Sequence, residues 1–142
     1  MIDSHKMIAL QTLKIHEGYR QFIYLDSVGI ETCGFGRNLK DKGLSEREAE
    51  YLLRNDINEA EQDLVKEYSY YPSLSTARKA VLINMVVNLG ATKFRGFKKM
   101  HNALNNKDYK KASIEMLDSK WSQQVGNRSI QLAKIMEEEF LT

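Results

Sequence analysis

Three side chains near the N-terminus have the types and the spacing that glycoside hydrolysis requires. Glu17 is followed nine residues later by Asp26, and Thr32 comes six residues after Asp26. A glycosidase uses one carboxylic acid to protonate the leaving oxygen and a second carboxyl group on the other side of the scissile bond. In an inverting enzyme the two groups lie roughly 6.5–9.5 Å apart, which leaves room for a water molecule. Glu17 and Asp26 are therefore a candidate acid and base.

The surroundings expected for these side chains suit different roles. An acid that gives up a proton near neutral pH needs burial beside apolar groups. Glu17 follows Leu13 and Ile15 and precedes an aromatic segment, so we expect an apolar pocket around it. Asp26 stands at the tip of a predicted strand and is expected to be wetter. A connecting loop with an odd number of residues would place positions 26 and 32 on one face of the hairpin, where the Thr32 hydroxyl could orient water.

Spacing alone does not establish this chemistry. A Glu and an Asp nine residues apart arise by chance in many chains with 19 acidic residues. Glutamates near helix ends are usually solvated, and Gly34 and Gly36 are equally explained as bulges or as sites of tight strand packing.

Composition narrows the class of protein. The 142 residues suffice for one domain with a buried core, and a net charge of +2 is too balanced to favour nucleic acid. The segment "KFRGFKK" is basic, but we interpret it as a solvated turn. The single cysteine, Cys33, excludes an intrachain disulfide and a cysteine-clustered metal site, and we expect it to be a small strand residue. The longest apolar run is far too short to cross a bilayer, so we expect no stable membrane insertion.

The elements that would position the candidate side chains are mostly helical. A first helix is predicted to stop near Gly18, and residues 22–39 are predicted to form a hairpin. Ser45 and Glu48 form a capping box that starts a long helix over residues 46–68. Beyond the break at Pro72, we predict helices over residues 76–90, 97–104, 109–117 and 128–140. Leu82, Met85, Val86 and Trp121 are predicted core residues, and Asp108 and Asn127 are candidate helix caps.

Several separated motifs resemble the phage-type lysozymes, glycoside hydrolase family 24. The catalytic signature of that family is matched by Glu17, Gly18, Arg20, Tyr24, Asp26, Thr32, Gly34 and Gly36. The segment "VLINMVVNLG" followed by Gly96-Phe97 resembles the central buried helix of the family. The segment "SKWSQQVGNR" resembles its C-terminal Trp…Asn-Arg segment.

The resemblance implies a fold and an activity. The fold would be α+β and predominantly α-helical, a lysozyme-like single domain over residues 1–142 with two lobes. A small β-hairpin lobe would cover residues 16–45, a connecting helix residues 46–68, and a helical lobe residues 73–142. The activity would be that of a muramidase, which cleaves the β-1,4 bond between N-acetylmuramic acid and N-acetylglucosamine in peptidoglycan, without a metal or an organic cofactor.

Residue roles follow from the same resemblance. Glu17 would be the general acid. Asp26 would be the carboxylate that activates water or stabilises the oxocarbenium-like state, and Thr32 would hold the water, giving inversion. Arg128 matches an arginine that lies near the acid in the family, although it could equally tie the last helix to the hairpin lobe. Asn38, Val87 and Arg128 are candidate substrate-binding residues.

Some positions depart from the family pattern and put sugar contacts in doubt. Arg37 stands where the family often carries His, and Asn38 and Val87 replace apolar and aromatic residues. Family positions for sugar contact fall at Met100 and Glu115, which are chemically unlike the polar residues expected there.

The resemblance also implies a biological setting. No secretory signal is visible, so we expect a monomeric phage or prophage endolysin in the host bacterial cytoplasm. A holin-like partner would release it to the peptidoglycan. Two alternatives remain, a lytic transglycosylase, which needs only a catalytic Glu, and an inactive muramidase-like module that binds cell wall or serves in virion assembly.

Overall fold

The computed structural model describes residues 3–139, which divide into two compact units. The first unit comprises residues up to Tyr51 and the second begins at Leu52, so the division falls inside one helix, α2 (Glu46–Glu67). Each unit is described separately below. The candidate side chains Glu17, Asp26, Thr32 and Asn38 belong to the first unit, and Val87 and Arg128 belong to the second.

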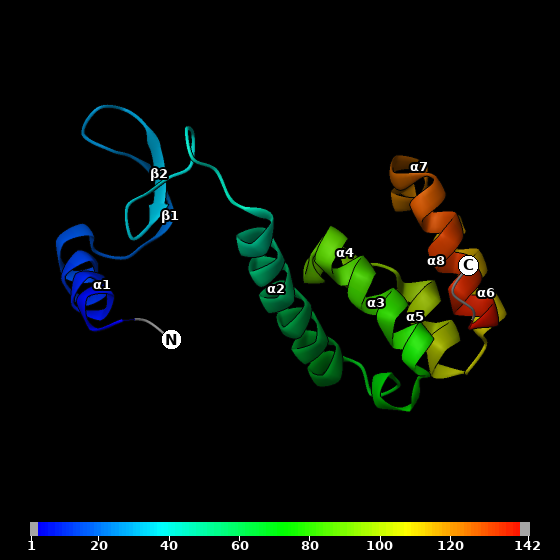
Figure 1. Ribbon diagram of the computed structural model, residues 1–142. Coiled ribbons are helices and arrows are strands. Elements are labelled where there is room, and N and C mark those ends of the chain that lie inside the picture. The colour runs from blue at the N-terminus through cyan, green and yellow to red at the C-terminus, as the bar shows by residue number, and fades with distance from the viewer. Residues whose placement is uncertain (1–2, 140–142) are drawn as a thin grey trace. The chain divides into compact units, whose positions relative to one another are not determined.

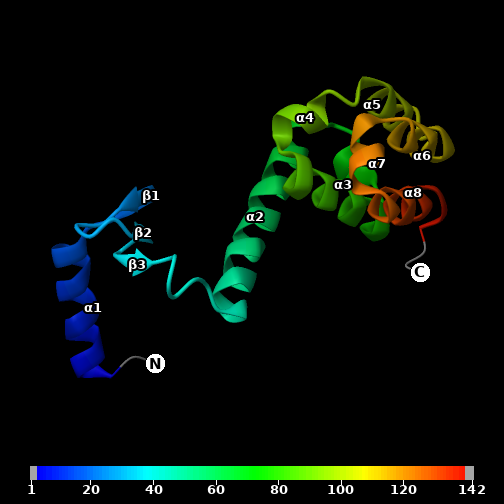
Figure 2. The same ribbon diagram turned by 90° about the horizontal axis from the view of Figure 1, so that it is seen from above.

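The first unit consists of one helix, a small sheet and the first part of α2. Helix α1 (Ser4–Glu17) ends at Gly18, whose φ of 70° suits glycine and whose N–H donates to the Lys14 carbonyl oxygen. Strands β1 (Arg20–Leu25), β2 (Glu31–Gly34) and β3 (Arg37–Asn38) form an antiparallel sheet in the order β1-β2-β3 (Figure 2). The hairpin is as predicted, whereas the short third strand was not predicted.

The start of α2 confirms the predicted capping box. The Ser45 hydroxyl accepts from the Glu48 N–H at 3.1 Å, and Glu48 Oε1 accepts from the Ser45 N–H at 2.9 Å. These reciprocal bonds satisfy two amides that a helix start leaves without partners. Arg37 of β3 pairs with the same Glu48 carboxylate through both terminal guanidinium nitrogens, so this carboxylate ties the sheet to the helix start.

The second unit holds the hydrophobic core. Its further elements are a 3₁₀ turn (Tyr71–Ser73), α3 (Thr76–Leu89), α4 (Ala91–Arg95), α5 (Lys98–Asn105), α6 (Tyr109–Leu117), α7 (Lys120–Val125) and α8 (Asn127–Glu138). Helix α6 packs against α5 and α8, and α8 packs against α3 (Figure 1). Leu82 and Met85 of α3 are fully buried and Val86 nearly so, as predicted.

Two buried polar groups in this core are internally bonded. The Nδ1 atom of His101 lies 2.7 Å from the Tyr70 hydroxyl, and its Nε2 lies 2.9 Å from the Phe94 carbonyl oxygen. Burial lowers the pKa of His101, since it disfavours the charged imidazolium. A neutral ring that donates from Nε2 and accepts at Nδ1 satisfies both contacts.

The predicted helix caps have mixed outcomes. Asp108 caps α6 as predicted, because its side chain accepts from the Lys111 N–H at 3.1 Å. Asn127 is instead the first residue of α8, and the cap position is taken by Gly126 at a φ of 57°. The prediction for Asn127 was therefore wrong. The predicted end of the last helix at Phe140 lies outside the described residues.

Candidate active site

Glu17 is positioned by close contact between the end of α1 and the turn from β2 to β3. A methyl group built on Gly36 would lie 2.6 Å from Glu17 Oε2 and 2.9 Å from its Cδ, so the carboxylate would have to shift to admit any side chain at position 36. The neighbouring Phe35 ring lies 5.5 Å from the Lys14 ammonium and 5.7 Å from the Tyr19 ring. These contacts hold the turn against α1. Both this close packing and a φ of 76° favour glycine at position 36.

The first unit does not supply the apolar pocket expected around Glu17. The Glu17 side chain is exposed. Ile15 is 80% exposed and Phe22 is 76% exposed, so the apolar neighbours do not close over the carboxylate within this unit. A hairpin of six- and four-residue strands beside one helix has too little surface to bury its own apolar side chains. That expectation is therefore not met by residues 3–51.

Asp26 organises the loop of the hairpin. Its Oδ1 accepts from the N–H groups of Val28 and Ile30, each at 2.9 Å. The Asp26 carbonyl oxygen accepts from the Gly29 N–H at 3.0 Å, where a φ of 83° favours glycine. Within residues 3–139 the second carboxylate oxygen, Oδ2, has no hydrogen-bond partner, and it is free to accept from another group.

Strand register places Asp26 and Thr32 on the same face of the sheet. Tyr24 pairs directly with Thr32, and the Asp26 N–H donates to the Ile30 carbonyl oxygen at 2.9 Å. Directly paired residues share a face and side chains alternate along a strand, so Tyr24, Asp26 and Thr32 lie on one side. The loop between the two strands, residues 26–30, has five residues, an odd number as the prediction required.

The Thr32 hydroxyl has a defined orientation. Thr32 is 3% exposed and is the one buried residue among residues 3–51. Its hydroxyl donates to the Ile30 carbonyl oxygen at 2.8 Å. Because its single hydrogen is used, the oxygen can offer only its lone pairs to a further partner.

The Glu17–Asp26 separation and the catalytic roles of Glu17, Asp26 and Thr32 stay predictions.

Asn38 shares the face of Thr32 but is engaged locally. It pairs with Thr32 across β2 and β3. Its Nδ2 donates to an Asp41 carboxylate oxygen at 3.1 Å, and its Oδ1 accepts from the Asp41 N–H at 2.9 Å. A sugar hydroxyl would have to compete with these bonds. Substrate binding by Asn38 stays a prediction.

The candidate residues of the second unit lie on α3 or are hydrogen-bonded to it. Arg128 donates from Nε and Nη2 to Asn84 Oδ1, at 3.1 and 2.7 Å. Trp121 donates from Nε1 to Asn88 Oδ1 at 2.7 Å and is 3% exposed, so it is the core residue that was predicted. The two asparagines are four residues apart on one helix face and were not singled out in the sequence. Val87 is half-buried against the core, and sugar contact by Val87 or Arg128 stays a prediction.

Comparison with known proteins identifies the family. The family model described as phage lysozyme matches residues 14–138. The chain belongs to the phage lysozyme family. It is 28% identical to a probable T4-type lysozyme 2 and 27% identical to a probable T4-type lysozyme 1, both from Dictyostelium discoideum. In each case 88% of this chain and 91% of the relative are covered.

Family membership confirms the resemblance read from the sequence and the α+β lysozyme-like fold. It supports a lysozyme-type glycosidase activity with peptidoglycan as the substrate class. Within residues 3–139, no helix has the length and apolar character needed to span a bilayer. The same residues contain no group of three or more His, Cys, Asp or Glu side chains arranged to hold a metal ion.

Proposed function

We propose that the protein is a muramidase that hydrolyses the β-1,4 bond between N-acetylmuramic acid and N-acetylglucosamine with inversion. The observation that carries the proposal is the shared face of Asp26 and Thr32, on a sheet whose next turn contacts Glu17. A base and a hydroxyl on one side of a ribbon can hold one water molecule between them. An inverting mechanism needs such a water on the side of the sugar opposite the leaving group.

The hydrogen bonds already made by Asp26 and Thr32 define how that water would be held. The Thr32 hydroxyl donates its hydrogen to the Ile30 carbonyl oxygen, so its oxygen would accept a hydrogen bond from the water. Asp26 Oδ1 is occupied by two amides, so Oδ2 accepts the second water hydrogen. The lone pair of the water oxygen is then directed away from both residues and toward the anomeric carbon.

The proposed reaction balances with these groups alone. Glu17 donates its proton to the glycosidic oxygen as the bond to the anomeric carbon of N-acetylmuramic acid breaks. The water oxygen bonds to that carbon from the opposite face and loses a proton to Asp26. Proton exchange with solvent then restores an acidic Glu17 and an ionised Asp26.

Further substrate contacts are proposed for Asn38, Val87 and Arg128. With Nε and Nη2 directed at Asn84, the Nη1 group of Arg128 has no partner among the described residues and can donate to a polar substrate group. Val87 offers an apolar contact, and Asn38 an amide if its bonds to Asp41 open.

The proposed setting is that of a phage or prophage endolysin. The protein would accumulate as a monomer in the host cytoplasm and reach the periplasmic wall once a holin-like partner opens the membrane. Expression alone should then leave cells intact, whereas co-expression with a membrane-permeabilising protein should lyse them. Lysis without such a protein would contradict this part of the proposal.

The activity is tested by clearing of permeabilised bacterial cells. Wild-type protein should lower turbidity and release saccharides. Glu17→Gln should reduce the rate by roughly 10²–10⁴, the usual contribution of a general acid, with an unchanged circular dichroism spectrum. Full activity of folded Glu17→Gln would refute the assignment, and an inactive wild type would favour a wall-binding or assembly module.

A further inference from the structure

His101 is a titratable side chain in the core of the second unit that the proposed chemistry does not use. It lies on α5 and is 9% exposed. Its ring stacks on the Tyr68 ring, with centroids 4.5 Å apart and planes at 9°, and the Phe94 ring meets it edge to face at 5.0 Å. The imidazole thus joins three segments of the chain, namely α4, α5 and the residues that follow α2.

The hydrogen bonds of the ring require one protonation state. Burial raises the pKa of the Tyr70 hydroxyl, so this group keeps its hydrogen and donates it. Within residues 3–139 its one partner is His101 Nδ1, at 2.7 Å. Nδ1 is therefore the unprotonated nitrogen, and Nε2 carries the hydrogen that it donates to the Phe94 carbonyl oxygen at 2.9 Å. Only a neutral imidazole satisfies the whole network.

A second proton on the ring would break this network. Nδ1–H and the Tyr70 O–H would both be donors directed at each other, so the hydroxyl would have to turn away. Tyr70 is only 8% exposed, and a buried hydroxyl without a partner is destabilising. The positive charge would also be held away from water, and a cation–π contact with Tyr68 would offset only part of this cost.

No carboxylate among the described residues pairs with this ring. The charged side chains beside Tyr68 and Phe94 are Asp63, Glu67 and Arg95. The pKa of Tyr68 is raised by burial, lowered by Arg95 and raised by Glu67, so these two charges act in opposite directions beside the stacked ring. Within residues 3–139 none of the three forms an ion pair with His101.

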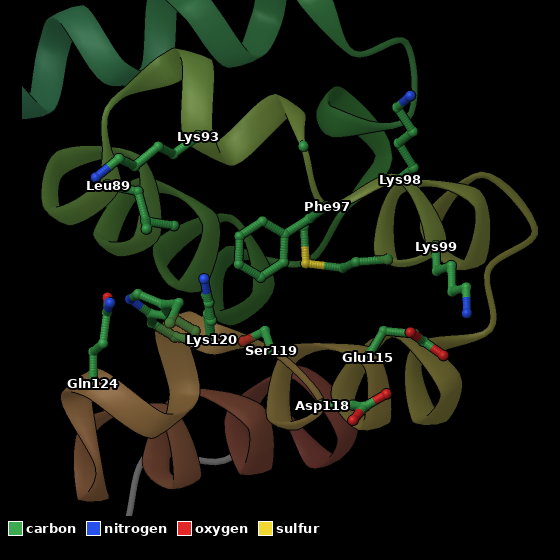
Figure 3. A pocket seen from close by; sticks show the side chains of 13 residues that line it. Leu89, Lys93, Phe97, Lys98, Lys99, Glu115, Asp118, Ser119, Lys120 and Gln124 are labelled. Atoms are coloured by element: carbon green, nitrogen blue, oxygen red, sulfur yellow. The ribbon is translucent and has the colours of Figure 1, made fainter.

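The charges of α5 itself lie at the surface. Lys98 and Lys99 line the pocket shown in Figure 3, and His101 does not contribute to that lining. Two ammonium groups on the same helix would in any case disfavour a further positive charge. The surroundings of His101 therefore contain nothing that stabilises an imidazolium as well as water does.

We propose that His101 is an acid-sensitive switch in the second unit. A proton taken from solvent onto Nδ1 would displace the Tyr70 hydroxyl and loosen the attachment of residues 68–70 to α4 and α5. The effect on wall lysis in mildly acidic surroundings rests on the proposed function, whereas the acid response itself does not.

The direction of the response follows from the folded network. Burial lowers the pKa of His101 from its ordinary value of 6.5, and the hydrogen bond to the Phe94 carbonyl oxygen opposes this shift only in part. The folded unit thus prefers the neutral ring. Its stabilisation is fully present above pH 6.5 and is lost as pH falls toward the lowered pKa.

NMR of the histidine rings in the full-length protein reads the protonation state directly. The chain has three histidines, so the ring signal that disappears in His101→Gln identifies His101. At about pH 7.5 its ¹⁵N shifts should show hydrogen on Nε2 and none on Nδ1. On acidification the ring should titrate below pH 6.5.

Unfolding of the second unit should reveal the same proton. Trp121 is the only tryptophan and is buried in this unit, so its fluorescence in a urea titration reports unfolding there. Between pH 6.5 and about 5.5, a ring that stays neutral when folded should raise the unfolding equilibrium constant roughly fivefold. His101→Gln can still donate and accept but does not titrate, so it should lack this part of the acid response.

The matched control is His5→Gln/His16→Gln. It makes the same substitution at two exposed histidines of α1, in the first unit, and should retain the acid response of the second unit. Amide hydrogen exchange, corrected for the intrinsic effect of pH, then locates the change. In wild type, residues 68–70 should lose more protection on acidification than α8, and in His101→Gln they should not.

Four results would overturn the proposal. They are hydrogen on Nδ1 at about pH 7.5, titration of His101 at or above pH 6.5, an equal acid response in wild type and His101→Gln, and equal loss of protection in residues 68–70 and α8. If His101→Gln does not fold, the tautomer and the titration measured on wild type, with the ring assigned from the His5→Gln/His16→Gln spectrum, still decide. No hydrolysis is measured, so failure here is separate from failure of the proposed glycosidase activity.

Discussion

Glu17, at the end of α1, and Gly36, in the turn between β2 and β3, lie against each other, although they are 19 positions apart in the chain. The glycine contributes no side chain because the carboxylate occupies the space that a Cβ would need. The turn that follows β2, the strand of Thr32, therefore packs directly on the proposed acid at this residue.

Gly36→Ala should displace the Glu17 carboxylate, and Gly34→Ala is its matched control. Both glycines have positive φ, 76° and 69°, so each alanine should cost about 1–2 kcal/mol in backbone strain. Nothing lies within 4 Å of a Cβ at Gly34, whereas the Cβ at Gly36 would clash with Glu17. We expect Gly36→Ala to lose roughly ten- to a hundredfold more lytic activity than Gly34→Ala. Equal activities, with unfolding by denaturant showing both proteins folded, would mean that the contact does not position Glu17.

Asp26→Asn should separate the loop-forming role of Asp26 from its proposed role as a base. An asparagine Oδ1 can still accept from the Val28 and Ile30 amides, so the loop should persist. Turnover should fall by roughly 10²–10⁴ because an amide cannot take a proton from water. Asp26→Ala should also lose the activity. In addition, its free energy of unfolding should fall by about 0.5–1.5 kcal/mol for each loop hydrogen bond removed. High turnover by Asp26→Asn would exclude Asp26 as the base.

Thr32→Val removes the hydroxyl that would hold the proposed water, whereas Thr32→Ser retains it. Valine keeps the branched shape that suits a strand but removes the hydroxyl, whereas serine retains it. The Ile30 carbonyl oxygen keeps its bond from the Asp26 N–H in either variant, so stability should fall by only about 0.5–1.5 kcal/mol. Steady-state hydrolysis should drop roughly tenfold or more in Thr32→Val and much less in Thr32→Ser. If the two variants hydrolyse substrate equally fast, the hydroxyl does not hold the water.

The Glu48 carboxylate should make stability depend on pH in the acid range. The Ser45 N–H and, next, the Arg37 guanidinium lower the pKa of Glu48 from 4.5 to about 2. The folded state thus prefers the ionised form, so this stabilisation is fully present above pH 4.5 and is lost as pH falls toward 2. Urea unfolding across that window should show a shallower pH dependence for Glu48→Gln than for wild type. Glu46→Gln, in the same helical turn, should behave like wild type, and a wild-type slope in Glu48→Gln would contradict the assignment.

Local signals in the sequence predicted much of the fold. Three features were predictable because they depend on residues close in the chain. Gly18 ends α1, Ser45 and Glu48 cap α2, and the loop length fixes the register of the hairpin. Helices α4 and α7 were not predicted, since five and six residues are too short to show a helical period. Asn127 failed as a cap because the neighbouring Gly126 adopts the required turn.

The candidate site was predictable only in part. The residue types and the shared face of Asp26 and Thr32 follow from spacing and register. The contact between Glu17 and Gly36, the Arg37–Glu48 pair and the Asn84–Arg128 bonds join residues that are distant in sequence. No local sequence pattern encodes such pairs. The exposure of the Glu17 side chain was not predicted either, because it depends on the small size of the first unit.

The configuration of the first-formed product tests the central claim most directly. Fresh digests of soluble peptidoglycan strands can be followed by proton NMR before the anomers equilibrate. Attack by a water held between Asp26 and Thr32 predicts a new reducing end of α configuration, inverted from the β link. A β reducing end would contradict the account and indicate a retaining route with Asp26 as nucleophile, and an anhydromuramic end would indicate a transglycosylase.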